Sequence, residues 1–220
     1  MTTESERAVE MYLCQRGIFV ERIAESADKS PDYRAMIDDA EVIIEVKQFD
    51  ATEEELKQLE ELKDGELLVV DATPGKGVRK KISDAASQLR GLAKDRCPAL
   101  LILYNSRPFL LGNPANPYEI LVGMYGFETI VLVRGSGSAP PRVKRKFGGS
   151  RKLTETHNTT ISAIAVMEAR DGDIVCRVYH NEHAACPLPV GRLARYGASE
   201  FVLSARKEGK LQEWVAINGA

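Results

Sequence analysis

The stretch SPDYRAMIDDAEVIIEVKQF, residues 30–49, carries three charged side chains that a strand hairpin would bring together. Asp32 follows a proline, while Glu45 and Lys47 lie two residues apart near the end of an apolar run. Side chains alternate along a strand, so Glu45 and Lys47 share one face. In a hairpin Asp32 comes beside Glu45, and two neighbouring carboxylates repel each other unless a divalent cation lies between them. We therefore predict a metal site here.

The predicted ion is Mg²⁺ or Mn²⁺, because Mg²⁺ binds through one or two carboxylates, waters and substrate phosphates. Asp32 and Glu45 supply the carboxylates, and the backbone carbonyl of Val46 is a further candidate ligand. Lys47 would lie beside the attacking water, which it would orient, or it would stabilise charge on a phosphate or act as a base. A surface salt-bridge network on a two-stranded edge is the alternative, and the apolar run EVIIEV argues against it.

The elements around this hairpin predict an α/β fold with a mixed sheet flanked by helices. Apolar spacing and capping signals predict helices over 4–16, 52–63, 78–94 and 118–125. Strands are predicted over 18–23, 33–37, 41–47, 99–104 and 128–133, the last two of them buried. With the main helices alone, the order is α-β-β-β-α-β-α-β.

A segment rich in Gly, Ser, Pro and basic residues, 135–152, is predicted to be a linker or a mobile loop. It follows a core over 1–134 and precedes a β-rich C-terminal section over 153–220. Strands in that section are predicted over 160–169, 173–180, 200–203 and 214–217. The section extends the main sheet, packs on it or mediates subunit pairing, and the sequence does not choose among these.

The hairpin motif and the element order together resemble the PD-(D/E)xK nuclease superfamily, whose restriction-endonuclease-like fold has an αβββαβ core. Asp32, Glu45 and Lys47 match the motif, in a hairpin that follows one helix and one strand. Members often carry an acid on the first helix. The resemblance implies that role for Glu6, eleven residues before Gly17, as a member of the metal site.

The resemblance also implies a polar residue on the helix after the motif, and Gln88 takes that position. The implied function is metal-dependent hydrolysis of phosphodiester bonds in DNA, with RNA as the second choice, by an endonuclease rather than an exonuclease. A homodimer is implied because cutting two strands needs two sites. A catalytically inactive nucleic-acid-binding or assembly protein is the alternative. An acidic insertion over 50–65 departs from the family pattern.

Charge is uneven along this chain of formal net charge −2. Residues 50–66 hold eight acids and two lysines, whereas residues 134–152 hold seven basic residues and no acid. Because local charge steers a phosphate backbone, two basic clusters are candidates for binding nucleic acid, with a solvated basic face as the alternative. They comprise Lys76, Arg79, Lys80 and Lys81 at a helix start, and Arg142, Lys144, Arg145 and Lys146 in the basic segment.

The remaining composition predicts a cytoplasmic protein with no membrane partner. The 220 residues contain no apolar run of about 18 residues, and the polar N-terminus lacks the features of a signal peptide. The four cysteines form no CxxC pair, so reduced thiols are expected. Zinc binding is one interpretation of the pattern formed by Cys176, His180, His183 and Cys186. We favour a strand end followed by a turn, because zinc sites usually pair two clusters across a spacer.

Overall fold

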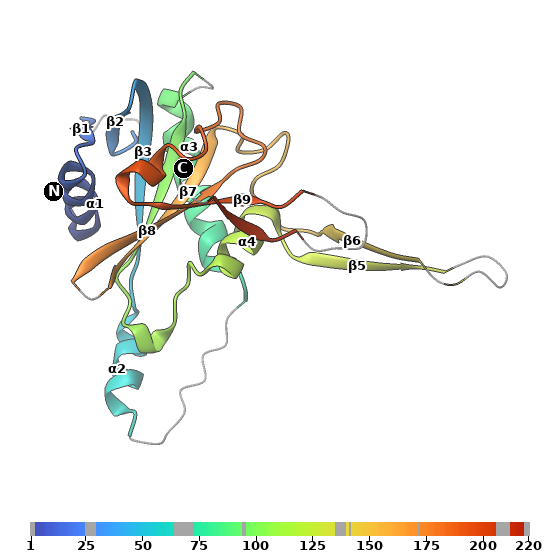
Figure 1. Ribbon diagram of the computed structural model, residues 1–220. Helices are drawn as coiled ribbons and strands as arrows, with labels where there is room; N and C mark the ends of the chain where they lie inside the picture. The colour runs from blue at the N-terminus through green and yellow to red at the C-terminus, as the bar shows by residue number, and fades with distance from the viewer. Residues whose placement is uncertain are drawn as a thin grey trace.

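The computed structural model describes residues 3–24, 30–63, 73–93, 96–134, 140, 142–170, 172–205 and 212–217. Its centre is an eight-stranded mixed sheet with helices on both faces (Figure 1), which confirms the predicted α/β class. In sheet order the strands are β1 (Phe19–Arg22), β2 (Tyr33–Ile37), β3 (Ala40–Phe49), β4 (Ala99–Asn105), β7 (Ile161–Arg170), β8 (Asp173–His180), β9 (Ser199–Leu203) and β10 (Trp214–Ile217).

Three parallel strands form the middle of this sheet. β4 runs parallel to β3 on one side and to β7 on the other, and six of its seven residues are buried. Strands covered on both faces read as continuous apolar runs, as ALLILY does. Antiparallel strands flank the centre: β1 and β2 lie beyond β3, and β8 lies beyond β7. At the far side, β9 is parallel to β8 and β10 antiparallel to β9.

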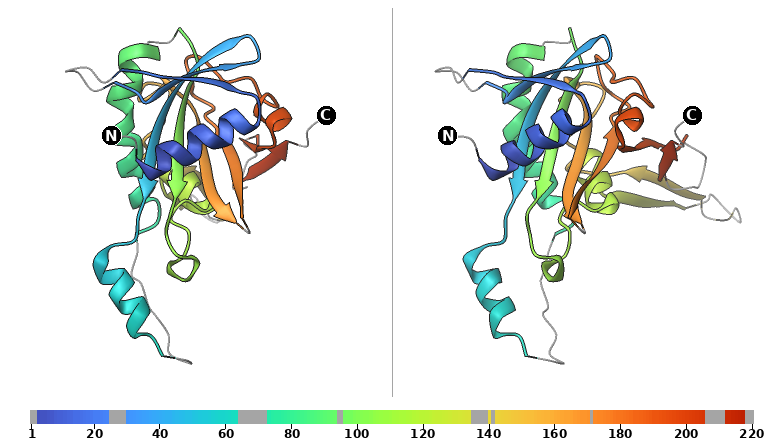
Figure 2. Two further views of the ribbon diagram at one scale, coloured as in Figure 1. Left: turned by 90° about the vertical axis from the view of Figure 1, so that its left-hand side faces the viewer. Right: turned by 60° about the vertical axis from the view of Figure 1, so that its left-hand side comes forward.

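Helices cover the two faces separately (Figure 2). α1 (Glu4–Gln15) packs its buried residues Val9, Tyr12 and Leu13 on one face, where the short 3₁₀ helix η2 (Leu193–Tyr196) also lies. α3 (Lys76–Ala93) and α4 (Pro117–Tyr125) pack on the other. Alternate residues of β3 therefore face α1 or α3, and Glu45 and Lys47 share the α3 side with Ile43.

The C-terminal section belongs to the main sheet. β7 lies directly beside β4, and β8, β9 and β10 continue from it. Of the three arrangements that the sequence leaves open, extension of the sheet is the one observed. Residues 1–134 alone would leave one edge of the buried strand β4 unpaired, so the two halves of the chain build one core.

The structure corrects two predictions for the segment after α4. β5 (Glu128–Val133) has the predicted bounds but is not buried: it pairs with β6 (Arg142–Phe147) in a separate two-stranded sheet. Part of the predicted linker is therefore a strand. The physical reason is that β3 and β7 occupy both edges of β4 and leave no place beside it. We call this pair the β5–β6 ribbon, and it projects from the body of the molecule (Figure 1).

The acidic insertion forms a second projection. α2 (Glu53–Glu61) begins after Thr52, whose side chain accepts a hydrogen bond from the Glu55 N–H at 3.2 Å. All of its residues are described, and none of them is buried. Figures 1 and 2 show α2 standing off the sheet, below the C-terminal end of β3. Across the described residues, the helices are too short or too polar to traverse a lipid bilayer.

The crossing of α3 and α4 yields a stability prediction. A Cβ placed on Gly123 of α4 would lie 2.6 Å from the Cβ of Val78 on α3, so Gly123→Ala must push the helices apart. We expect the free energy of unfolding to fall by about 1–3 kcal/mol, measured by urea denaturation. Gly91→Ala is the control, because a Cβ there meets nothing within 4 Å. That change should stabilise α3 by about 1 kcal/mol. Equal effects of the two substitutions would contradict the close crossing.

Candidate active site

The β2–β3 hairpin places Asp32 at the edge of β3. Its two-residue turn joins Ile37 to Ala40, and Asp38 in the turn has a φ of 50°. Just before β2, the backbone N–H of Asp32 donates to the Ile44 carbonyl at 3.1 Å. One carboxylate oxygen of Asp32, Oδ2, then accepts a hydrogen bond from the backbone N–H of Val46 at 2.7 Å. The Asp32 side chain thus accepts a β3 backbone hydrogen bond at a position that lies before the first residue of β2.

Glu45 lies next along β3 and is the most deeply buried charged group of this site. Its side chain is 1% exposed. Both carboxylate oxygens are buried without a well-aligned hydrogen bond, although the Lys47 ammonium lies 2.5 Å from Oε1. A buried carboxylate in that condition carries a large desolvation cost. The site therefore favours either a proton on Glu45 or a cation beside it.

Lys47 is held by a short chain of contacts from α3. Its Nζ donates to Oε1 of Gln88 at 3.0 Å, and Nε2 of Gln88 donates to the Ser30 carbonyl at 3.1 Å. Gln88 thereby connects the lysine to the segment just before Asp32. The Lys47 side chain is 23% exposed, so its ammonium group reaches the surface while Glu45 stays beneath. The Ser30 carbonyl was not anticipated from the sequence, because a backbone acceptor carries no residue signature.

Burial sets the protonation of the two carboxyl groups. Burial, and after it the neighbouring Asp32, together raise the pKa of Glu45 to about 7 against the opposing effect of Lys47. Burial also raises the pKa of Asp32, while the Val46 N–H works in the other direction. The charge of Asp32 thus disfavours ionisation of Glu45, and the charge of Glu6 disfavours ionisation of Asp32. A bound cation would relieve both effects.

The arrangement fits a hard divalent cation. The buried Glu45 carboxylate has the Lys47 ammonium 2.5 Å from Oε1, and the Asp32 carboxylate accepts a hydrogen bond from the N–H of the next strand residue, Val46. The N–H and C=O of one strand residue point to the same side, so the Val46 carbonyl also faces Asp32. Two carboxylates and a carbonyl make an oxygen donor set suited to Mg²⁺ or Mn²⁺.

Glu6 lies near Asp32, and its carboxylate contacts other groups. One of its carboxylate oxygens lies 2.7 Å from the Arg22 guanidinium and 3.4 Å from the backbone N–H of Thr3, which caps α1. Throughout the described part of the chain, no three His, Cys, Asp or Glu side chains gather closely enough to hold a metal. The role of Glu6 as a ligand stays a prediction: its carboxylate contacts Arg22 and the helix cap, and its charge helps raise the pKa of Asp32. Neither partner was anticipated, although Thr3 and Glu6 have capping-box spacing.

The four basic residues in the first turns of α3 differ in what they contact. Arg79 donates to the Pro74 carbonyl at 3.0 Å and stacks on Phe127, so its guanidinium is committed within the fold. Lys76 and Lys80 are exposed. Lys81 is half-buried, with its Nζ 5.4 Å from the Phe49 ring centre, and burial lowers its pKa. Since Lys81 lies seven residues before Gln88, the two share a side of the helix about 10 Å apart.

The second basic cluster lies elsewhere. Arg142 is exposed at the start of β6, on the ribbon that points away from β3 (Figure 1). The side chains of Lys144, Arg145 and Lys146 lie outside the described part of the structure. The structure thus places the α3 cluster, and not Arg142, on the element that carries Gln88.

The C-terminal cysteine–histidine pattern has other contacts. His180 ends β8, and its Nε2 lies 2.6 Å from Oε2 of the buried Glu200. Cys176 is buried in the core, where burial raises the pKa of its thiol to about 12. His183 packs edge-on against Tyr125. Among the described residues no three His, Cys, Asp or Glu side chains form such a cluster, and β8 ends at His180 as predicted.

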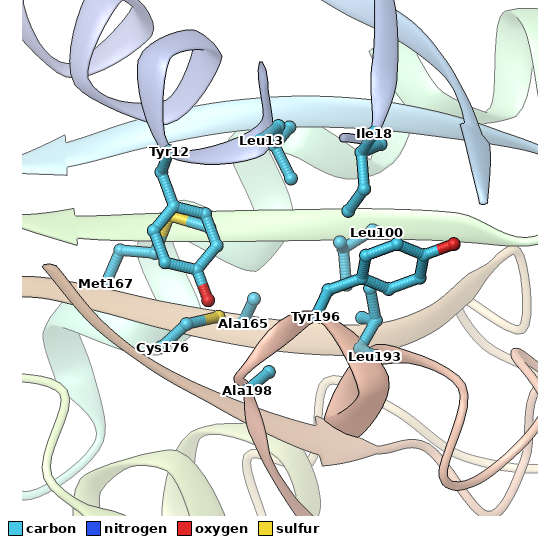
Figure 3. A pocket seen from close by; sticks show the side chains of 10 residues that line it. All are labelled: Tyr12, Leu13, Ile18, Leu100, Ala165, Met167, Cys176, Leu193, Tyr196 and Ala198. Atoms are coloured by element: carbon cyan, nitrogen blue, oxygen red, sulfur yellow. The ribbon is translucent and has the colours of Figure 1, made fainter. Parts of the chain in front are cut away.

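One pocket lies on the face opposite Glu45, between α1 and η2 (Figure 3). Figure 3 shows side chains from α1, the sheet and η2 converging on it. Its ten lining residues are mostly apolar, and the Tyr12 hydroxyl points toward the neighbouring Cys176 thiol. It offers no convergent charged groups, so it is not the candidate catalytic centre.

Comparisons with known proteins leave the family open. No family model matches the chain, and no curated protein matches it. The solved structure of Pyrococcus furiosus SfsA in complex with Ca²⁺ is similar at 14% identity and a TM-score of 0.27, over 78% of this chain. The chain spans 58% of the length of that protein. These values assign neither fold nor function.

The raised pKa of Glu45 predicts a pH-dependent stability. Below pH 4.5 the carboxyl group is protonated whether the chain is folded or not. Between pH 4.5 and about 7 the unfolded chain loses this proton while the folded protein keeps it, so the metal-free protein loses stability as pH rises. Above that window the loss in the free energy of unfolding is complete and amounts to about 3 kcal/mol.

Glu45→Gln removes this titration. In EDTA, its free energy of unfolding relative to the unsubstituted protein should rise through the window and then level off, as urea denaturation at pH 4, 6 and 8 would show. Glu41→Gln, at the exposed start of β3, is the matched control and should show no such trend. A difference between Glu45→Gln and the unsubstituted protein that does not change with pH would contradict the assignment.

Proposed function

We propose that this protein is a metal-dependent nuclease that hydrolyses phosphodiester bonds in DNA, with RNA as the second substrate class. The observation that supports it is the buried Glu45 carboxylate, which has Lys47 2.5 Å from one oxygen and the charge of Asp32 close enough to raise its pKa. One lysine offsets one carboxylate, so the second carboxylate leaves negative charge that a divalent cation would neutralise.

Asp32, Glu45 and the Val46 carbonyl would hold Mg²⁺ or Mn²⁺ in this proposal. Glu6 is left out of the set, because Arg22 occupies its carboxylate. Two carboxylates are enough, since Mg²⁺ completes its shell with waters and substrate phosphate oxygens. When bound, the ion polarises the phosphate and makes a neighbouring water more acidic.

Lys47 is the residue of this chain that would act on the attacking water and on the phosphate. Its ammonium group donates hydrogen bonds that orient the attacking water and stabilise negative charge developing on the phosphate. Gln88 is a positioning residue: it holds Nζ at 3.0 Å and is itself held by the Ser30 carbonyl. A lysine fixed in this way loses less freedom when the substrate arrives.

The basic side of α3 is the proposed path for the nucleic acid backbone. Lys81 and Lys80 follow the exposed Lys76 along the helix, towards the turn that carries Gln88. Lys81 has no ion-pair partner among the described residues. A phosphate next to the scissile one would supply that partner.

The element order α1-β1-β2-β3-α3-β4, with α2 inserted, is the order that the resemblance to PD-(D/E)xK nucleases implies. It supports the proposal together with the motif geometry. Endonuclease action belongs to the same proposal. A catalytically inactive nucleic-acid-binding protein is the competing outcome, because Lys47 and Glu45 already partly neutralise each other.

Plasmid cleavage tests the proposal directly. The purified protein should nick or linearise plasmid DNA with Mg²⁺ or Mn²⁺ and not in EDTA. Asp32→Asn and Lys47→Ala should each lower the rate at least ~100-fold, as for the loss of a group that acts on the transition state. Glu41→Gln, an exposed acid of the same strand paired with Arg34, should cut normally.

Two results would count against the nuclease. Binding of DNA without cutting in either metal would favour the inactive protein. Cutting that survives both Asp32→Asn and Lys47→Ala would place the activity somewhere else in the preparation.

A further inference from the structure

The two projections of the molecule carry opposite charge. α2 has five glutamates and one lysine in nine residues. β6, with the sequence RVKRKF, has four basic residues in six, and Arg134 follows β5. One projection is thus strongly acidic and the other strongly basic, although the whole chain is nearly neutral at −2.

Both projections also expose apolar side chains. On the β5–β6 ribbon, Leu132 is 70% exposed, and Ile130, Val133 and Val143 are exposed beside it. Near α2, the short turn η1 (Phe109–Leu111) presents Phe109 at 95% and Leu110 at 71% exposure. η1 is tied to α2 by the ion pair of Arg107 with Glu55 at 2.6 Å. Each projection therefore combines apolar groups with charge of one sign.

Such surfaces need a partner. A two-stranded ribbon standing alone in water is marginally stable and usually packs against something else. The described parts of β5 and β6 pair with each other and are not strands of the main sheet. Nucleic acid would match the basic residues of the ribbon but not its row of apolar side chains. A surface that is both acidic and apolar matches both, and α2 with η1 is such a surface.

One chain cannot make this contact with itself, because α2 and the ribbon leave the body in different directions (Figure 1). We propose that the β5–β6 ribbon of one copy docks on the α2–η1 surface of a second copy. Leu132 and Ile130, on one face of the ribbon, would pack against Phe109 and Leu110, while Arg142, on the other face beside Val133, would meet the glutamates of α2. If the contact is reciprocal, the smallest closed assembly is a two-fold dimer with two such contacts.

The direct test is the mass of the full chain in solution, by sedimentation velocity across a concentration series, without metal or nucleic acid. Self-association is expected, and it should weaken as salt rises because exposed charges are screened. Since neither metal nor DNA is present, the outcome does not depend on whether the protein is a nuclease.

Charge reversal tests which surfaces meet. Glu60→Lys with Glu61→Lys reverses the end of α2, where lysines also suit the helix dipole. Arg134→Glu with Arg142→Glu reverses the described end of the ribbon. Each pair should weaken association about tenfold or more, from several charge pairs of modest individual worth. All four changes in one chain should restore association, because the charges are then exchanged.

Apolar substitution tests the other half of the contact. Leu132→Ser should weaken association, and Phe19→Ser, an equally exposed position on β1, should not. Three results would overturn the proposal: a wild-type monomer at all concentrations, failure of the fourfold variant to recover, or equal effects of Leu132→Ser and Phe19→Ser. An unchanged mass with weaker DNA binding in Arg134→Glu/Arg142→Glu would make the ribbon a nucleic-acid arm instead.

Discussion

The burial of the Glu45 carboxylate is the constraint on which the account of this site depends. A carboxylate inside a sheet is costly unless a positive group lies beside it, and among the described residues Lys47 is that group, 2.5 Å from Glu45. Asp32 adds a second negative group on the neighbouring edge and raises the pKa further. The folded protein therefore stores an unfavourable interaction at one place. A divalent cation would convert it into a favourable one, which is how a site for a metal differs from a salt bridge.

The surrounding fold maintains that condition. β4, itself paired with β7, pairs with β3 from Ile43 to Phe49, which holds the strand around Glu45 in the middle of the sheet. The hairpin fixes Asp32 through the Ile44 carbonyl and the Val46 N–H. α3 supplies Gln88, which holds the ammonium group of Lys47. Backbone and side-chain contacts from three elements thus pre-organise the site, so little ordering remains for the substrate to induce.

Local patterns in the sequence were sufficient to predict the β2–β3 hairpin. The alternation in YRAMI and the apolar run AEVIIEV fixed both strands and put Glu45 and Lys47 on one face. The sequence did not show which strand would pair with each edge of β4. ETIVLV looks like a buried strand, but β7 takes the edge of β4 that it would need, and β7 comes about 30 residues later in the chain. Likewise, Arg22 is far from Glu6 in sequence, so the ion pair between them is seen only in the folded structure.

Calorimetric titration of Mg²⁺ or Mn²⁺ into the metal-free protein, in two buffers of different ionisation enthalpy, tests the central claim most directly. A cation that binds Glu45 must displace its proton wherever the pKa of about 7 keeps it there. The account predicts release of roughly three-quarters of a proton per ion at pH 6.5. The release should fade by pH 8.5 and be absent in Glu45→Gln. Binding without proton release at pH 6.5, or no binding at either pH, would contradict it.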